Sequence, residues 1–225
     1  MEAKTSILKL EHVQFSYESS KPIIDIETLK LSQGERVFLH GPSGTGKSTL
    51  LNLICGVLDP LSGNITFNQQ NLGTLSSSNR DKLRGSELGV IYQSFNLISY
   101  LSPLENILLP ARLHRRGDFK SLESKADDLL EKMNLNEVKD QPSSTLSMGQ
   151  QQRVAAARAL ILSPKLIVAD EPTSSLDQKN TELFMEQLFL CDPKTTILFV
   201  SHDQSLEKYF QKSYSLEEIN RGRKS

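Results

Sequence analysis

The segment GPSGTGKS, residues 41–48, carries the residue types and spacing that bind phosphate groups. It matches the pattern G-x-x-x-x-G-K-[ST], follows an apolar run typical of a strand and opens a helical stretch. Its three glycines allow the backbone to curl so that successive N–H groups point at phosphate oxygens. We expect Lys47 to reach the β- and γ-phosphates and the Ser48 hydroxyl to hold Mg²⁺. The segment therefore predicts a site for a nucleoside triphosphate.

The segment KLIVADE, residues 165–171, adds two carboxylates. Its apolar residues predict a buried strand that brings Asp170 to the carboxyl end of a sheet, near the Mg²⁺, where open α/β sheets bind their ligands. Glu171 follows directly and is placed to polarise an attacking water. Many strands end in acidic residues, so this motif is weak alone. Paired with the phosphate loop it becomes strong.

Three more residues stand where predicted strands end. The amide of Gln93 can coordinate Mg²⁺ or the attacking water, and an imidazole N–H of His202 can hydrogen-bond a γ-phosphate. Tyr17 could stack on adenine or be a half-buried strand aromatic. Alone, Gln93 and His202 would be ordinary strand-end polar residues. Their expected position at the same sheet edge as Ser48 and Asp170 favours a role in the site.

The surrounding sequence predicts two kinds of strand. Alternating apolar and polar residues at 7–17, 23–31 and 65–67 predict an antiparallel sheet in the amino-terminal third. Nearly continuous apolar runs predict central parallel strands covered on both faces, at 36–41, 88–93, 165–170 and 195–202. Helical stretches separate them, at 47–55, 151–162, 179–190 and 204–211. This alternation indicates an α/β core.

Between residues 93 and 146 the pattern changes to helices alone, which predicts an inserted helical subdomain. Apolar residues there recur on one helix face: Leu122, Ala126, Leu129, Leu130 and Met133. The basic cluster ARLHRRGDFK, residues 111–120, is either a solvated face or a contact with a partner or a lipid headgroup. The polar tail EEINRGRKS, from residue 217 onward, is expected to be frayed.

Composition and charge exclude several classes of partner and of membrane protein. A net charge of −1 and a pI near 6.4 give no overall attraction to nucleic acid or anionic lipid, so we expect no nucleic-acid partner. The amino terminus lacks a signal-peptide pattern. The longest apolar runs fall short of the roughly 20 residues that a transmembrane helix needs, so another chain must supply any membrane spans. Cys55 and Cys191 have neither metal-binding nor disulfide spacing, and we expect both to be reduced.

The segment LSMGQQQR, residues 146–153, places a serine and a glycine beside a second helix start, which suits a phosphate group. The motifs then follow one another in the order Tyr17, GPSGTGKST, Gln93, LSMGQQQR, LIVADEPTSSLD and His202. This ordered set resembles the nucleotide-binding subunit of an ABC transporter over residues 7–216. LSMGQ is similar to the signature of that family, usually LSGGQ, which ordinary P-loop enzymes lack.

The resemblance implies a P-loop NTPase core with an amino-terminal antiparallel β subdomain and an inserted helical subdomain. We expect residues 1–225 to be a single ABC ATPase domain. Within it, residues 1–93 and 151–225 would form the α/β core with the β subdomain, and residues 94–150 the helical subdomain with the signature. Residues 92–113 resemble the branch of lipoprotein-releasing, macrolide-exporting and cell-division ATPases.

The resemblance also implies a head-to-tail dimer of two copies of this chain that encloses two ATP molecules. One copy would contact ATP and Mg²⁺ through Tyr17, Gly41, Pro42, Ser43, Gly44, Thr45, Gly46, Lys47, Ser48, Thr49 and Gln93. The other copy would reach the same ATP through Ser147, Met148, Gly149, Gln150 and Asp177. Mg²⁺ would be held by Ser48, Gln93 and Asp170. In catalysis Glu171 would be the general base, and His202 and Lys47 would hold the γ-phosphate.

Two positions depart from the family pattern. The sequence SSLD stands where SALD is usual, a small change that we expect to be tolerated. Met148 replaces the first glycine of LSGGQ, and a left-handed backbone there would cost about 1–2 kcal/mol. We predict instead an ordinary backbone at Met148, a helix that starts near Gln150, and a methionine side chain turned away from ATP.

The favoured function is ATP hydrolysis that drives a separate membrane permease, with this chain on the cytoplasmic face of the membrane. The apolar stretch Leu97, Ile98, Tyr100 and Leu101 would shape a groove for that partner, or it belongs to the subdomain core. One alternative is mechanical signalling across the membrane without cargo. A soluble ABC protein acting on ribosomes or DNA usually carries two ATPase halves or a coiled-coil insert, and neither is present. The presence of Glu171 and His202 argues against a non-catalytic nucleotide-binding regulator.

Overall fold

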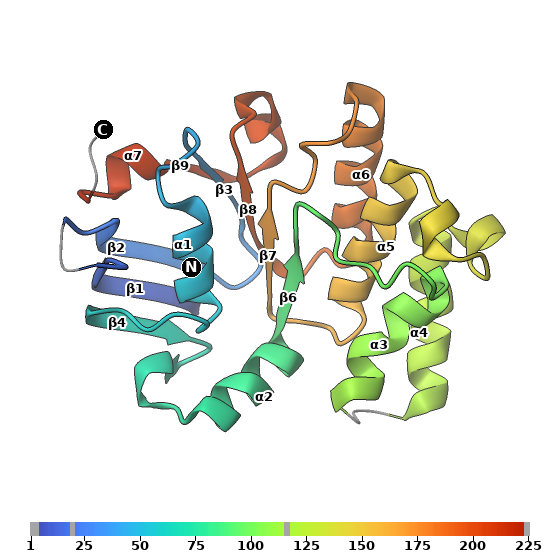
Figure 1. The fold of residues 1–225 in the computed structure, drawn as a ribbon, viewed down its shortest axis with the longest axis horizontal. Helices are drawn as coiled ribbons and strands as arrows, with labels where there is room; N and C mark the ends of the chain where they lie inside the picture. Colours follow the sequence, from blue (N-terminus) through green and yellow to red (C-terminus); the bar gives the residue numbers. More distant parts are fainter. Residues whose placement is uncertain (1–4, 19–20, 115–117, 223–225) are drawn as a thin grey trace. The chain divides into compact units, whose positions relative to one another are not determined.

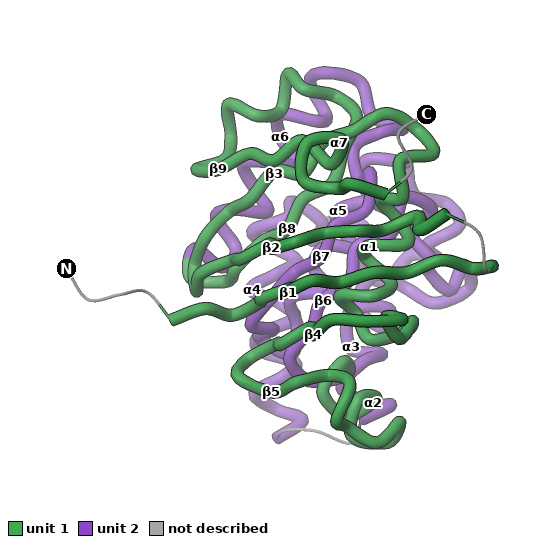
Figure 2. Tube along the Cα trace, turned by 90° about the vertical axis from the view of Figure 1, so that its left-hand side faces the viewer, with its two compact units in different colours: residues 1–84, 194–225 green, residues 85–193 purple. Residues whose placement is uncertain are grey.

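The computed structural model of the chain describes residues 5–18, 21–114 and 118–222. The chain folds into two compact units (Figure 2). The first unit consists of residues 1–84 and 194–225, and the second unit of residues 85–193. Among the described residues, no helix combines the length and apolar character needed to cross a bilayer.

The first unit contains an antiparallel sheet in the strand order β2-β1-β4-β5 (Figure 2). Its strands are β1 (Ser6–Phe15), β2 (Ile24–Ser32), β4 (Ser62–Phe67) and β5 (Gln70–Asn71). In β1 the buried positions shift by one residue at His12, whose φ is 52°, so that Leu10 and Val13 are both buried. A bulge of this kind keeps the apolar residues on one face. The three predicted amino-terminal strands are confirmed.

Parallel strands form the other sheet of the first unit. The strand β3 (Arg36–His40) pairs with β8 (Thr196–Ser201) on one side and with β9 (Lys212–Ser215) on the other. Every residue of β8 is buried, as its continuous apolar run predicts. The rings of Phe38, Phe199 and Phe210 pack together, with centroids 5.2 to 6.4 Å apart. The polar sequence of β9 did not predict a strand.

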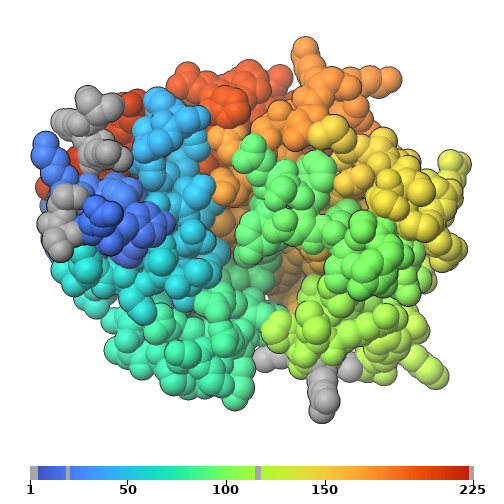
Figure 3. Space-filling model, viewed as in Figure 1, coloured from blue at the N-terminus to red at the C-terminus, as the bar shows by residue number. Residues whose placement is uncertain are grey.

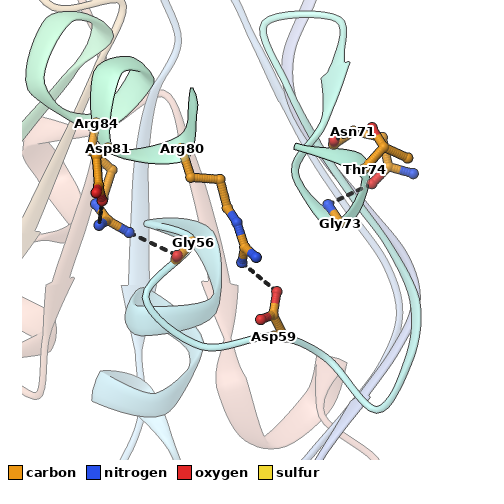
Figure 4. Close-up of polar contacts among 8 residues, drawn as sticks. All are labelled: Gly56, Asp59, Asn71, Gly73, Thr74, Arg80, Asp81 and Arg84. Carbon is orange, nitrogen blue, oxygen red and sulfur yellow. Dashed lines mark hydrogen bonds and ion pairs between the residues drawn. The ribbon is translucent and has the colours of Figure 1, made fainter. Parts of the chain in front are cut away.

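The helix α2 (Ser77–Glu87) was also missed, since Leu83 is its buried residue and its sequence has no apolar face. Two arginines tether it to the turn that follows α1 (Lys47–Ile54), as Figure 4 shows. Arg80 pairs with Asp59, and Arg84 donates to the carbonyl oxygen of Gly56 at 2.8 Å. These long-range contacts, rather than an apolar stripe, fix the helix in place.

The end of the chain corrects two expectations. The predicted helix at 204–211 is a 3-10 helix over Gln204–Tyr209. The tail is not frayed up to Gly222, because α7 (Leu216–Ile219) buries Leu216 and is followed by the buried Asn220. Residues 223–225 lie outside the described part of the chain.

The second unit contains a pair of parallel strands together with its longer helices (Figure 1). These elements are β6 (Leu88–Ile91), β7 (Leu166–Asp170), α3 (Pro103–His114), α4 (Phe119–Lys132), α5 (Met148–Leu160) and α6 (Gln178–Cys191). All five apolar residues predicted on one helix face, from Leu122 to Met133, are buried. Figure 3 shows α3 and α4, in green and yellow-green, side by side at the surface of this unit. An antiparallel sheet and parallel strands with helices confirm the predicted fold class.

Candidate nucleotide-binding and signature sites

The phosphate loop joins β3 to α1 in the first unit. Gly44 and Gly46 have φ angles of 83° and 97°, a left-handed backbone that glycine adopts without strain. Thr45 Oγ1 donates to the carbonyl oxygen of Pro42 at 2.8 Å and holds the curl from within. Two of the three glycines therefore turn the backbone ahead of the helix in a left-handed conformation.

The ammonium group of Lys47 lies inside this loop. Lys47 is buried, and its Nζ donates to the carbonyl oxygens of Gly41 at 2.6 Å and Pro42 at 3.2 Å. Ser48 is exposed beside it, whereas Thr49 is buried. A buried cation held by carbonyl oxygens of a phosphate loop is in a position to exchange them for the stronger, charged oxygens of a phosphate group.

Two further predicted site residues lie in the first unit. Tyr17 is 62% exposed, and its hydroxyl lies 3.4 Å from Thr49 Oγ1 on α1. His202 is exposed and directly follows β8. Because His40 pairs with Ser201 in parallel register, His202 and the start of the phosphate loop follow the same edge of the sheet. The predicted common edge is therefore present for these two elements.

The C-terminal segment contacts the phosphate loop. The sequence did not predict this contact. Asn220 donates through Nδ2 to the carbonyl oxygens of Ile23 at 2.9 Å and Thr45 at 3.4 Å. Its Oδ1 accepts from the backbone N–H of Asp25 at 2.7 Å. The buried Leu216 side chain lies close to Gly41, with its Cβ 3.3 Å from the point that a Cβ there would occupy. Asn220 thus joins the chain end, the start of β2 and the phosphate loop.

In the second unit, Asp170 and Gln93 lie at one edge of a parallel strand pair. Asp170 ends β7, and Gln93 follows β6 by two residues. The register pairs Ile91 with Ala169, so both residues lie beyond the same edge of the strand pair. The carboxylate of Asp170 and the amide of Gln93 both have an oxygen atom that can coordinate Mg²⁺, as the prediction requires.

Glu171 has an unusual backbone. It is 8% exposed and has a φ of 47°, and its carbonyl oxygen accepts from the N–H of Ser174 at 3.2 Å. A left-handed conformation costs a residue with a Cβ about 1–2 kcal/mol. Such strain is concentrated at functional positions, where the surrounding structure enforces it. The turn after Asp170 therefore holds Glu171 in a backbone conformation that residues with a Cβ rarely adopt.

The signature segment begins α5 with a capping box. Ser147 Oγ accepts from the N–H of Gln150 at 3.3 Å, and Gln150 Oε1 accepts from the N–H of Ser147 at 2.9 Å. The helix consequently begins at Met148, two residues before the predicted start. The S-x-x-Q spacing in LSMGQ was the signal for this earlier start. The positive end of the helix suits an anion.

Met148 has the ordinary backbone that was predicted. It is the first residue of α5 and has no positive φ, and its side chain is 51% exposed. A methionine therefore replaces glycine here without backbone strain. Whether this side chain points away from ATP stays a prediction.

Asp177 caps the next helix and is connected to the signature. Its Oδ1 and Oδ2 accept from the backbone N–H and the Nδ2 of Asn180, both at 2.8 Å. These hydrogen bonds lower the pKa of the exposed Asp177 carboxyl below its usual value. Asn180 Oδ1 lies 3.2 Å from the point where a Cβ of Gly149 would stand. Asn180, which was not predicted as a site residue, thus bonds to Asp177 and lies close to the signature glycine.

The sequence predicted two surface features in the helical part, an apolar groove and a basic cluster. Tyr100 is 76% exposed, while Leu97, Ile98 and Leu101 are half-buried, so the predicted apolar groove is partly subdomain core. Within the basic cluster, Arg112 stacks over the Phe119 ring at 5.7 Å. Residues 115–117 of that cluster lie outside the described residues.

Neither Cys55 nor Cys191 forms a disulfide in the structure. Cys55 is buried. At Cys191, partial burial of the thiol raises its pKa to about 11. A thiol with such a pKa is protonated at neutral pH and is a poor nucleophile and metal ligand.

Comparisons with known proteins agree with this set of motifs. The sequence profile of the ABC transporter family matches residues 25–174. The chain is 38% identical over 208 residues to the lipoprotein-releasing system ATP-binding protein LolD 1 of Rhodopseudomonas palustris, covering 89% of this chain and 91% of that protein. It is 39% identical to the macrolide export ATP-binding/permease protein MacB of Syntrophobacter fumaroxidans, covering 89% of this chain and 29% of that longer protein.

A solved structure supports the same relationship. The dimeric structure of an ATP-binding cassette in a post-hydrolysis state, bound to ADP and Pi, superimposes with a TM-score of 0.84 at 32% identity. The match covers 96% of this chain and 97% of that one. The phosphate loop, the capped signature helix and these relatives together establish that the chain belongs to the ABC transporter family of ATP-binding proteins, in the branch of LolD and MacB.

Proposed function

We propose that this chain is the ATP-binding and ATP-hydrolysing subunit of an ABC transporter of the lipoprotein-release or export type, which drives a separate membrane permease. The observation that carries the proposal is the phosphate loop, whose left-handed glycines curl the backbone ahead of the buried Lys47 ammonium. The names of the LolD and MacB relatives support the transport type, and a solved neighbour with ADP and Pi supports hydrolysis.

The nucleotide is held mainly by the first unit. Lys47 exchanges the carbonyl oxygens of Gly41 and Pro42 for β- and γ-phosphate oxygens, and the N–H groups of the loop donate to the same phosphates. The exposed ring of Tyr17 stacks on adenine. His202 donates an imidazole N–H to a γ-phosphate oxygen.

The family implies Mg²⁺, and the donor set of the chain fits this cation. The hydroxyl of Ser48, the amide oxygen of Gln93 and the carboxylate of Asp170 are hard oxygen ligands. Bound there, Mg²⁺ supplies neutralisation of the charge on the β- and γ-phosphates. Glu171 takes the proton of the attacking water, and its strained backbone is what we expect of a carboxylate held for this one task.

A second copy of the chain completes each ATP site in a head-to-tail dimer. Ser147 and the N–H of Gly149 approach the γ-phosphate of the partner's ATP, with the α5 dipole behind them. Gln150 keeps Ser147 oriented through the capping box, and Met148 and Asp177 contact the same interface. The solved dimeric neighbour supports this arrangement.

The permease partner places the chain at the cytoplasmic face of the membrane, bound through the exposed Tyr100 and its half-buried neighbours. Residues 1–225 form one ABC ATPase domain, with the helical subdomain at 94–150.

Purification of the chain from native membranes tests whether it binds a membrane permease. A captured protein with four spans and a large extracytoplasmic domain supports this branch of the family. Recovery of ribosomes or DNA without a membrane protein contradicts transport.

The enzymatic part is tested with the purified chain and Mg-ATP by measuring phosphate release. We expect Lys47→Ala to abolish release, because the phosphate-binding cation is lost. Lys30→Ala, which removes an exposed lysine of β2 in the same unit, is the matched control and should keep the wild-type rate. Equal phosphate release by the wild type and by a folded Lys47→Ala variant would overturn the proposal.

A further inference from the structure

The segment that follows Gln93 contains two consecutive residues with a left-handed backbone. Phe95 and Asn96 have φ angles of 57° and 49°, and the 94–102 loop continues from them to α3. Asparagine tolerates a left-handed backbone, but an aromatic residue rarely adopts it. Phe95 is nevertheless buried, so the turn is a fixed part of the structure. A fixed, strained turn needs contacts that hold it.

Arg158 of α5 supplies those contacts. Its Nη1 donates to the carbonyl oxygen of Asn96 and its Nη2 to that of Phe95, both at 2.6 Å. Two short bonds from one guanidinium to adjacent carbonyl oxygens form a charge-assisted, bidentate clamp. Burial lowers the pKa of Arg158, yet an arginine stays charged in proteins. The half-buried guanidinium therefore depends on these acceptors as much as the turn depends on the guanidinium.

The fold brings Arg158 close to this turn by packing α5 tightly on β6. At Gly89 of β6 an added Cβ would lie 2.5 Å from the carbonyl oxygen of Ala159, so a larger residue would push the helix away. Arg158 is the preceding residue on that helix. The same strand leads directly to Gln93. The close approach of α5 to Gly89 thus places Arg158 next to the backbone segment that follows β6.

The remainder of the 94–102 loop is attached to the segment just ahead of the signature. The N–H groups of Ser143 and Ser144 donate to the carbonyl oxygens of Leu101 and Ser99, both at 2.9 Å. The fully buried Asn106 donates to Ser143 Oγ at 3.0 Å, and it also bonds the backbone of Ile98. The loop is therefore tied to residues 143–158 at both of its ends.

We propose that Arg158 is the positioning residue of Gln93, fixing the turn that carries this amide to the helix that begins with the signature Ser147. The inference rests on the proposed ATPase function for its catalytic consequence. A shift of α5 would then move the Gln93 backbone with it. Arg158 acts through the carbonyl oxygens of Phe95 and Asn96.

The test is Arg158→Lys, which keeps the charge but cannot make the bidentate contact. We expect the kcat for ATP to fall about tenfold or more, because a small displacement of a site residue has effects of this size. The KM for ATP should stay near the wild-type value, since the phosphate loop is intact. Arg112→Lys, at an exposed arginine of α3, is the matched control and should change neither constant.

A double-mutant cycle distinguishes positioning from general destabilisation. If Arg158 acts through Gln93, Arg158→Lys should have no further effect on kcat in a Gln93→Ala background. An equal loss in both backgrounds, or no loss in the wild-type background, overturns the proposal.

Hydrogen exchange measures the clamp without ATP hydrolysis. Arg158→Lys should speed amide exchange in residues 93–98 while α4 keeps its protection. Unchanged exchange there overturns the clamp. Faster exchange in a chain without ATPase activity would retain the clamp and instead contradict the proposed function.

Discussion

Replacement of Asn220 tests how strongly the chain end supports the phosphate loop. Asn220 is 6% exposed and uses both polar atoms of its side chain. Asn220→Leu keeps a similar volume but leaves the N–H of Asp25 and the carbonyl oxygen of Ile23 without these partners. Two half-buried backbone groups left unpaired cost about 2–4 kcal/mol, the lower part of the range for such groups. For a chain of this length, that loss corresponds to a decrease of about 5–15 °C in Tm.

The same variant should weaken ATP binding. The contact of Asn220 with the carbonyl oxygen of Thr45 is equivalent to at most one net hydrogen bond, so we expect a two- to tenfold increase, roughly, in the Kd for ATP. Thermal unfolding and titration with a fluorescent ATP analogue measure the two effects. Glu218→Ala, at an exposed residue of α7, is the control. If Asn220→Leu melted together with the wild type, the inferred support of the phosphate loop would be wrong.

Three further predictions concern single residues. Glu171→Gln should bind ATP normally and hydrolyse it about 10²–10⁴-fold more slowly, because the general base is lost, and near-normal turnover would exclude Glu171 as that base. Met148→Gly should change the ATPase rate by no more than a few-fold, since Met148 already has an unstrained helical backbone; a large gain in rate would contradict this. In a Cys55→Ser chain, the Cys191 thiol should react with a disulfide reagent at pH 8 about 100-fold more slowly when native than when unfolded, because its pKa of about 11 leaves little thiolate. Reactivity should rise with pH towards 11, and equal rates in both states would refute this.

Local sequence patterns predicted the parts of this protein that local chemistry determines. The phosphate loop needs left-handed glycines, and its spacing reveals them. Continuous apolar runs predicted β3, β6, β7 and β8, because parallel strands are covered on both faces. The ordinary backbone at Met148 followed from the cost that a left-handed methionine would carry.

Contacts between distant residues explain what was missed. The helix α2 depends on Arg80 and Arg84 reaching a turn more than twenty residues earlier, which no periodicity reveals. Asn220 bonds to residues nearly two hundred positions away. Arg158 bonds to Phe95 across 63 positions, and in the sequence it is one more arginine of a helix. Only the earlier start of α5 could have been predicted locally, from the capping box.

The central claim is that each ATP is hydrolysed between the phosphate loop of one copy and the signature of another. Lys47→Ala removes the first, and Gly149→Glu should disable the second by placing a negative charge near the γ-phosphate while suiting the first turn of a helix. Each variant alone should be inactive. An equal mixture should recover up to about one quarter of the wild-type phosphate release, because half of the dimers combine both variants and each of those has one complete site. A mixture as inactive as either variant alone would contradict the account.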